Sequence, residues 1–332
     1  MALRVLSLVI LLGTVGLCFA QETACKAREI PVGVISLNGD AYRGLAAEDF
    51  IGHIQKKPVQ VKSLTYDDGP RRVLIVVDAS KKLSADSRKA ETEMIQSMTA
   101  AARPEDTFGL MVARGPGQDV KFTADHAALL QGLEQTGENK RGKDSGVLDT
   151  VMVGIEWFGA PQPGDSIVVI AADLEGNHKT NPKQVAKALE ENHIRLFGLA
   201  LGPVQTQSSV AGGAMTSTTS QGLAWTTPGV GDFVYNTGDS NFFPLTTNSG
   251  GLVISAMNGS SQRSYKISDP AVLQSVRQKA RAITKMIMAF YKMQIEPPQS
   301  GRPENWSLDI NESIQKNSKQ MFVLYPHELG PC

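Results

Sequence analysis

Three short runs of apolar residues set the strongest limit on how this 332-residue chain can fold. They read RVLIVVD at 72–78, SIVVIAAD at 166–173 and IRLFGLALG at 194–202. A strand with so few polar positions is covered on both faces, as a central strand of a parallel sheet is covered by helices. Two of the runs end in an aspartate, so acidic groups are expected where those strands stop.

Segments with helical periodicity lie between these runs. Asn181 and Asp269 each stand before a proline, which is the pattern of a helix N-cap followed by proline at the first helical position. Strands that alternate with helices require right-handed crossovers, which predicts a doubly wound, mostly parallel α/β sheet with β elements flanking it at both ends. Four residues mark the helical spacing in the segment after the first run: Ala90, Met94, Met98 and Ala101.

A long helix is expected to begin after Asp269. Its apolar positions form a stripe that packs on the sheet: Val272, Val276, Ile283, Ile287 and Phe290.

Changes in residue pattern divide the chain into parts. An irregular insertion at 203–248, rich in Ser, Thr, Gly and Gln, fits no period, and such a segment inside a compact domain is functional or mobile. The C-terminal strands are expected to pack back on the N-terminal unit. The four parts are a signal peptide at 1–20, a small β-rich unit with a helical turn at 21–70, the α/β domain at 71–256, and the long helix with terminal strands at 257–332.

The first 20 residues have the pattern of a secretory signal. An arginine near the start precedes an apolar run, and small Ala20 precedes polar Gln21, so cleavage is expected after Ala20. An uncleaved membrane anchor is the alternative, but the apolar run is short for a full span. A lipoprotein anchor at Cys18 is a further alternative, although Leu17 stands where that signal has a small residue. We therefore expect an exported protein without a membrane span after cleavage, located in the periplasm, at the cell surface or outside the cell.

Removal of the signal would leave two cysteines, Cys25 and Cys332, near the two ends of the chain. In an oxidising compartment such a pair is expected to form a disulfide. Closing so long a loop would stabilise the fold by about 4 to 5 kcal/mol in the chain-entropy model. Two unrelated free thiols are the alternative, because the sequence does not show whether their Cα atoms come close enough to bridge.

The charge balance argues against one class of partner. The chain carries 33 basic and 33 acidic residues and has no basic run. A nucleic-acid surface needs a basic patch, so no nucleic-acid partner is expected.

Oxygen-bearing side chains follow several of the expected strands. In an open parallel sheet, the loops at the carboxyl ends of the strands form the natural crevice for a ligand. Carboxylates and hydroxyls that converge there suit Mg²⁺ or Ca²⁺ rather than Zn²⁺. The alternative is that each acid simply caps a helix or lies in a solvated turn. The candidate metal ligands are Asp78, Ser80, Ser145 and Asp173.

These residues resemble the motifs of the von Willebrand factor A (VWA) family. VLIVVDASKK is similar to the Asp-x-Ser-x-Ser stretch that opens the family's metal-ion-dependent adhesion site, DSGVLDTV resembles its second loop, and IVVIAADLEGN resembles its third. The resemblance covers about residues 71–256, and the flanking segments resemble a secreted VWA subgroup described among acidobacteria. It implies a module that binds a protein or matrix partner noncovalently. In the family, a carboxylate of the partner completes the coordination of the cation.

The chain departs from the motif at Lys82, which stands where the family has its second metal-binding serine. A protonated lysine has no lone pair, so it cannot bind a cation, and it would repel one nearby. Lys82 either turns to solvent and leaves a weakened site, or folds in and replaces the metal. We expect metal loss, and therefore no cofactor. Glu175 and Asp149 are expected to be helix-cap or surface residues.

Three kinds of function remain open. The chain has no Gly-x-Ser-x-Gly, His-Glu-x-x-His or phosphate-loop motif, so an enzyme is not expected, although a hydrolase built from Ser80, His178 and Asp173 is an alternative. A purely structural module is another. A binding module would use Lys82 and His178 in the crevice or aromatic residues of the insertion, unless those only cover the insertion's own core. These aromatic residues are Trp225, Phe233, Tyr235 and Phe242.

Overall fold

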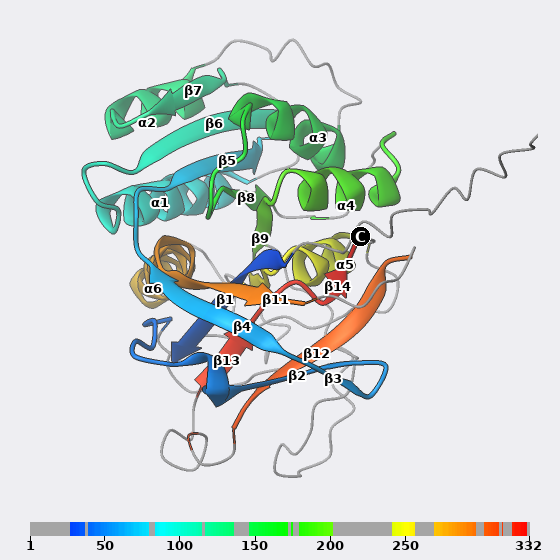
Figure 1. Ribbon diagram of the computed structural model, residues 1–332. Coiled ribbons are helices and arrows are strands. Elements are labelled where there is room, and N and C mark those ends of the chain that lie inside the picture. The colour runs from blue at the N-terminus through cyan, green and yellow to red at the C-terminus, as the bar shows by residue number, and fades with distance from the viewer. Residues whose placement is uncertain are drawn as a thin grey trace, which may run out of the picture.

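A six-stranded sheet forms the centre of the upper half of the molecule in Figure 1. The computed structural model describes residues 27–36, 39–79, 84–114, 117–135, 146–171, 174, 179–201, 241–255, 269–296, 302–311, 314 and 321–330. The strands of this sheet are β5 (Arg72–Asp78), β6 (Thr107–Arg114), β7 (Val120–Thr123), β8 (Ser166–Ala171), β9 (Arg195–Ala200) and β10 (Val253–Ser255).

The strand order is β10-β9-β8-β5-β6-β7. Every neighbouring pair is parallel except β6 and β7, which are antiparallel. The prediction of a doubly wound, mostly parallel α/β sheet is therefore confirmed. Every residue of β8 and of β9 is buried, as expected for strands that are covered on both faces and are apolar after their first residue.

Helices cover both faces of this sheet. One face packs against α1 (Ala85–Ala100), α2 (His126–Glu134) and α6 (Pro270–Met288). The other packs against α3 (Val147–Phe158), α4 (Pro182–Glu191) and α5 (Phe242–Asn248). The expected caps are confirmed: the Asn181 side chain accepts a hydrogen bond from the Lys183 N–H, and that of Asp269 accepts one from the Ala271 N–H.

Strands from both ends of the sequence build the lower half of Figure 1. They pair in two four-stranded sheets, β13-β1-β11-β4 and β14-β12-β2-β3, whose side chains share one apolar core. The strands are β1 (Arg28–Ser36), β2 (Phe50–Ile54), β3 (Lys57–Val59), β4 (Val61–Asp67), β11 (Phe290–Ile295), β12 (Glu304–Ile310), β13 (Met321–Leu324) and β14 (Glu328–Leu329). A short 3-10 turn, η1 (Ala47–Asp49), leads into β2.

The two halves share strand β1 because its side chains alternate between them. Ile30, Val32 and Val34 enter the core between the two β sheets. Ile35 points the other way and joins the core beneath α6. Because successive side chains of a strand point to opposite faces, β1 contributes to the core of the β-rich half and to the core of the α/β half.

Two sequence predictions are wrong about aromatic residues. Phe242 was expected at a partner surface within the insertion, but it begins α5 and is fully buried. Its ring lies so close to the Gly198 backbone that a Cβ there would come within 2.9 Å of it. Phe290 was expected on the stripe of the long helix, but α6 ends at Met288 and Phe290 begins β11. The position of each ring depends on contacts with segments that are distant in the sequence, and the periodicity of the sequence does not reveal such contacts.

Phe290 lies between two arginine side chains at the edge of the central sheet where the parallel strands begin. The Arg71 and Arg195 guanidinium carbons lie 4.5 Å and 4.6 Å from the ring centroid. Arg195 is fully buried and donates to the carbonyls of Met286 and Ile287 at the end of α6. Burial and the charge of Arg71 lower the pKa of Arg195 to about 9, so this guanidinium stays charged at neutral pH.

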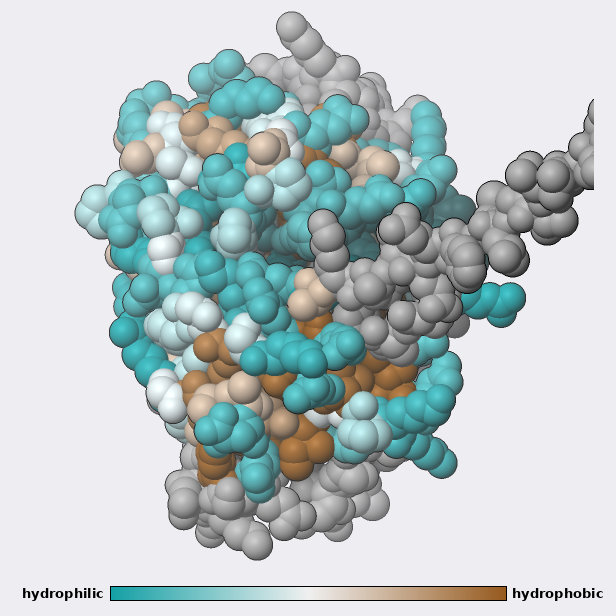
Figure 2. All heavy atoms as spheres, viewed as in Figure 1, coloured by the Kyte–Doolittle hydropathy of each residue, from teal (hydrophilic) through white to brown (hydrophobic). Residues whose placement is uncertain are grey.

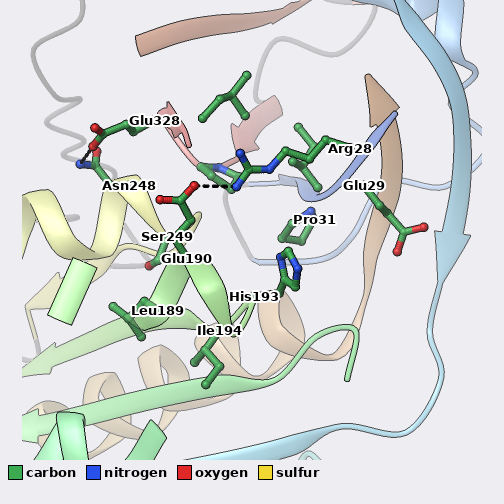
Figure 3. Close-up of a pocket in the computed structure, with 13 residues that line it drawn as sticks. Arg28, Glu29, Pro31, Leu189, Glu190, His193, Ile194, Asn248, Ser249 and Glu328 are labelled. Atoms are coloured by element: carbon green, nitrogen blue, oxygen red, sulfur yellow. Dashed lines mark hydrogen bonds and ion pairs between the residues drawn. The ribbon is translucent and has the colours of Figure 1, made fainter. Parts of the chain in front are cut away.

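A second contact joins the two ends of the described chain. The Arg28 guanidinium donates to Glu190 Oε1 at 2.7 Å and to the carbonyl of Gly330 at 3.0 Å. Figure 3 shows Arg28 and Glu190 turned toward one another across a hollow between α4 and β1. A Cβ on Gly330 would collide with the Glu190 carboxylate, so a larger residue there would require the Glu190 side chain to move.

The two halves also differ at the surface. Figure 2 shows that apolar residues gather on the strand-rich half of this face, whereas hydrophilic residues cover most of the helical half. Among the described helices, none is both long enough and apolar enough to cross a membrane.

The contact between Arg28 and Gly330 bears on the expected disulfide, whose cysteines lie outside the described residues. Cys25 precedes Arg28 by three positions and Cys332 follows Gly330 by two, and each residue spans at most about 3.6 Å, so the segments are long enough for the two to meet. We predict that exported protein, denatured and alkylated without reduction, keeps the mass of the unmodified chain. Cys25→Ser should expose one alkylatable thiol. Two alkyl groups on the wild-type chain would rule the disulfide out.

Candidate functional site

Two charged side chains meet at the carboxyl edge of the central sheet. Asp78 ends β5, and Arg114 ends the neighbouring parallel strand β6. Val77 pairs with Val112, but the register then shifts by one residue, so that Asp78 pairs with Arg114 and not with Ala113. This bulge places the acid and the guanidinium side by side.

The two groups form a bidentate ion pair. Arg114 Nε donates to Asp78 Oδ1 at 3.0 Å, and Nη2 donates to Oδ2 at 2.6 Å. The Asp78 side chain is 3% exposed and that of Arg114 is 20% exposed, so the acid lies behind the base. Pairing of this geometry compensates much of the cost of burying a carboxylate.

This pair does not fit a divalent cation on Asp78. Both carboxylate oxygens already accept from a guanidinium, and a cation bound to them would lie within a few ångströms of that positive charge. Two unit charges 4 Å apart repel by about 4 kcal/mol at an effective dielectric constant of about 20, and a divalent ion doubles this. Sequence reasoning missed Arg114, although an arginine that ends a neighbouring strand could have been noticed.

A second buried carboxyl group lies near this pair. Glu91 on α1 is 1% exposed, and its Oε1 has no hydrogen-bond partner among the described residues. Burial, and then the charge of Asp78, raise the pKa of Glu91 to about 8, while Arg88 opposes this shift. Glu91 is therefore mostly protonated at neutral pH and adds little negative charge beside Asp78.

Asp149 connects the start of α3 to the segment before α4. Its carboxylate accepts from the N–H of Gly146, from the N–H groups of Lys179 and Thr180, and from the Thr180 hydroxyl, at 2.5 to 3.2 Å. Burial alone would raise the pKa of Asp149, but these hydrogen bonds together lower it. Asp149 was expected to be a helix-cap or surface residue; it caps α3 and also fastens the segment before α4.

Among the predicted metal ligands and the predicted crevice residues Lys82 and His178, Asp78 is the one whose side chain the structure describes. The others lie outside the described residues, although their neighbours Ala79, Gly146, Leu174 and Lys179 are described. Within the described ranges, no three His, Cys, Asp or Glu side chains gather in a way that could hold a metal ion. The predicted residues outside those ranges are Ser80, Lys82, Ser145, Asp173, Glu175, His178, Trp225, Phe233 and Tyr235.

The hollow in Figure 3 is a second concave place, but four of its polar side chains already pair with each other. Arg28 pairs with Glu190, and the Asn248 amide donates to Glu328 at 2.9 Å. Glu29 points away from the other lining residues. The carboxyl edge with Arg114 is therefore the better candidate for binding.

Glu91→Gln should change how stability depends on pH. The folded-state pKa of about 8 lies above the ordinary 4.5, so the contribution of protonated Glu91 is fully present below pH 4.5 and is lost as pH rises through 8. Relative to wild type, the variant should gain about 1.4 kcal/mol of unfolding free energy per pH unit across that interval. Urea unfolding at pH 5, 6.5 and 8 measures this.

Glu93→Gln on the same helix is the matched control. A hydrogen bond from Arg277 lowers the pKa of Glu93, so its contribution is lost as pH falls and not as pH rises. A Glu91→Gln curve parallel to the wild-type curve would contradict the buried, protonated carboxyl group.

Asp149→Ala should destabilise the fold by about 1 to 2 kcal/mol at pH 7, because it removes a helix cap and the carboxylate that accepts from the N–H groups of Lys179 and Thr180. The lowered pKa means that the contribution of Asp149 is present above pH 3.8 and is lost as pH falls through the lower folded-state value. Urea unfolding at pH 7 and pH 3 measures both effects. Glu156→Ala, on an exposed position of α3, serves as control, and an equal loss there would contradict the assignment.

Comparison with protein-family models finds no match, and comparison with curated proteins finds none either. Solved structures do show similarity. A von Willebrand factor type A protein from Catenulispora acidiphila is 8% identical with a TM-score of 0.46, covering 92% of this chain and 74% of that chain. An aerotolerance-related membrane protein from Bacteroides fragilis is 17% identical with a TM-score of 0.39, covering 63% and 98%.

A third similar structure is the conserved hypothetical protein BatB from Bacteroides thetaiotaomicron, 17% identical with a TM-score of 0.40, covering 66% of this chain and 98% of that chain. Likeness at these identities and TM-scores concerns the fold alone. The acidobacterial subgroup stays a prediction. Two observations on this chain support a VWA-like fold independently of those structures: the strand order β10-β9-β8-β5-β6-β7 and the VWA-like motifs in the sequence.

Proposed function

We propose that this chain is an exported, VWA-like module that binds a protein or matrix partner noncovalently and without a divalent cation. One observation carries the metal-independent part: Arg114 holds both oxygens of Asp78, the first residue of the motif. A guanidinium in this place supplies the positive charge that a cation would otherwise supply.

The charge of the sequence supports the same proposal. Lys82 stands at the motif position of the second serine, and Arg114 pairs with Asp78, the first residue of the motif. The motif that binds a metal in the family is therefore associated with two cationic residues in this chain. Asp149 joins the start of α3 to Lys179 and Thr180, so the chain segments that flank the second and third motifs have a connection that needs no metal. The signal-peptide pattern of residues 1–20 supports export.

Calorimetry with Mg²⁺, Ca²⁺ and Mn²⁺ tests metal independence. We expect no saturable heat from the mature wild-type chain at millimolar cation. The Lys82→Ser variant should also bind weakly at most, because Arg114 still occupies Asp78. The alternative is a functional cation site at which the bound ion is completed by a carboxylate of the partner. Saturable binding of one cation per wild-type chain would contradict our proposal and favour this alternative.

Capture of a partner tests the binding function itself. The mature chain, immobilised and exposed to native envelope and extracellular material, should retain the same partner in EDTA as in Mg²⁺. The partner is then purified and its direct binding measured. Retention only in Mg²⁺ would overturn metal independence, whereas turnover of an ester or peptide panel that Ser80→Ala abolishes would favour the hydrolase.

A further inference from the structure

Arg114 has a second hydrogen-bonding side that Asp78 does not use. A guanidinium carries five N–H groups in a planar fork. Asp78 takes Nε and one hydrogen of Nη2, which leaves both hydrogens of Nη1 and the other hydrogen of Nη2. Among the described residues, none accepts from Nη1 of Arg114. A described nitrogen that is buried and has no hydrogen-bond partner occurs in Arg71 and in Arg195, but not in Arg114. Because Nη1 of Arg114 has no acceptor among the described residues and is not in this buried group, it is accessible to solvent.

Asp78 also determines where this second side points. Its side chain is almost fully buried, whereas Arg114 retains 20% exposure, so the acid holds the guanidinium from the inner side. A side chain that is already oriented loses less conformational freedom when it binds a ligand. The free side of Arg114 is thus a preorganised donor pair at the carboxyl edge of the sheet, where open α/β sheets bind ligands.

We propose that the free side of Arg114 binds a carboxylate of the partner, through parallel hydrogen bonds from Nη1 and Nη2. This inference rests on the proposed binding function and names the chemistry of the group that is recognised. Planar carboxylates match the planar fork in a bidentate way. The negative charge of Asp78, on the adjacent edge of the same guanidinium, disfavours a dianion more than a monoanion, so we favour a carboxylate over a phosphate.

Surface residues offer a matched comparison. Arg277 makes the same bidentate pair with Glu93, at 2.7 and 3.0 Å, between α6 and α1. The Arg277 side chain is 45% exposed, so water and salt compete there much more than at Arg114. If a carboxylate binds only to a guanidinium that is anchored and partly buried, it should bind at Arg114 and not at Arg277.

The test uses ¹⁵N-labelled mature protein and three blocked peptides, Gly-Asp-Gly, Gly-Asn-Gly and Gly-phosphoserine-Gly. We expect the Asp peptide to shift the Arg114 Nε–H resonance saturably and the Asn peptide to leave it unchanged. Arg114→Lys keeps the charge but loses the fork, so it should weaken binding of the Asp peptide about tenfold, read from backbone resonances at the ends of β5 and β6. Arg277→Gln should bind the Asp peptide as wild type does.

Removal of Arg114 can harm folding, because it leaves Asp78 buried without its pair. The double variant Asp78→Asn with Arg114→Gln removes both charges, and circular dichroism confirms whether it folds. A folded double variant should not bind the Asp peptide.

Three results would overturn the inference: no saturable shift in wild type, equal weakening by the Arg277 and Arg114 variants, or tighter binding of the phosphoserine peptide. The captured partner separates this inference from the function on which it rests. If Arg114→Lys retains that partner at wild-type affinity, the binding function stands and the role of Arg114 fails. If wild type captures no partner but binds the Asp peptide through Arg114, the site stands and the proposed function fails.

Discussion

The stack of Arg71, Phe290 and Arg195 is the contact on which the arrangement of the two halves depends. Arg71 precedes β5, Arg195 begins β9, and Phe290 begins β11, so one ring joins two central strands to the β-rich half. Burying a guanidinium costs several kcal/mol unless its charge and donors are compensated. Carbonyls at the end of α6 and the faces of Phe290 supply part of this compensation.

This stack leaves little freedom around it. Gly164 approaches the Phe290 ring and Arg71 so closely that a Cβ would come within 2.8 Å of both, and its φ of +84° suits glycine. Asp67 accepts from Arg71 and pairs with Lys292, which connects the end of β4 to β11. A charged junction of this kind favours one packing of the two halves, because any other would bury Arg195 without its partners.

What the sequence predicts well here is local. The caps at Asn181 and Asp269 depend on residues one or two positions away, and the buried strands depend on composition alone. Arg195 could not be predicted to be buried, since arginine is rarely buried and its partners come from α6, some 90 positions later. Phe242 falls in the insertion because residues 203–248 are rich in Ser, Thr, Gly and Gln and fit no period, but its burial depends on the space beside Gly198. The role of Arg114 depends on a one-residue shift of register, which no periodicity encodes.

Strand β5 connects the two places at which charge is buried. Arg71 lies just before its first residue and Asp78 is its last, about 23 Å apart for seven extended residues. Hydrogen bonds to β6 and β8 hold it on both sides along nearly its whole length. A partner that pulled on the pair of Asp78 and Arg114 along the strand would therefore load these hydrogen bonds together, in shear, and would not open them one at a time. Such a load would be shared between β5 and the two strands that pair with it.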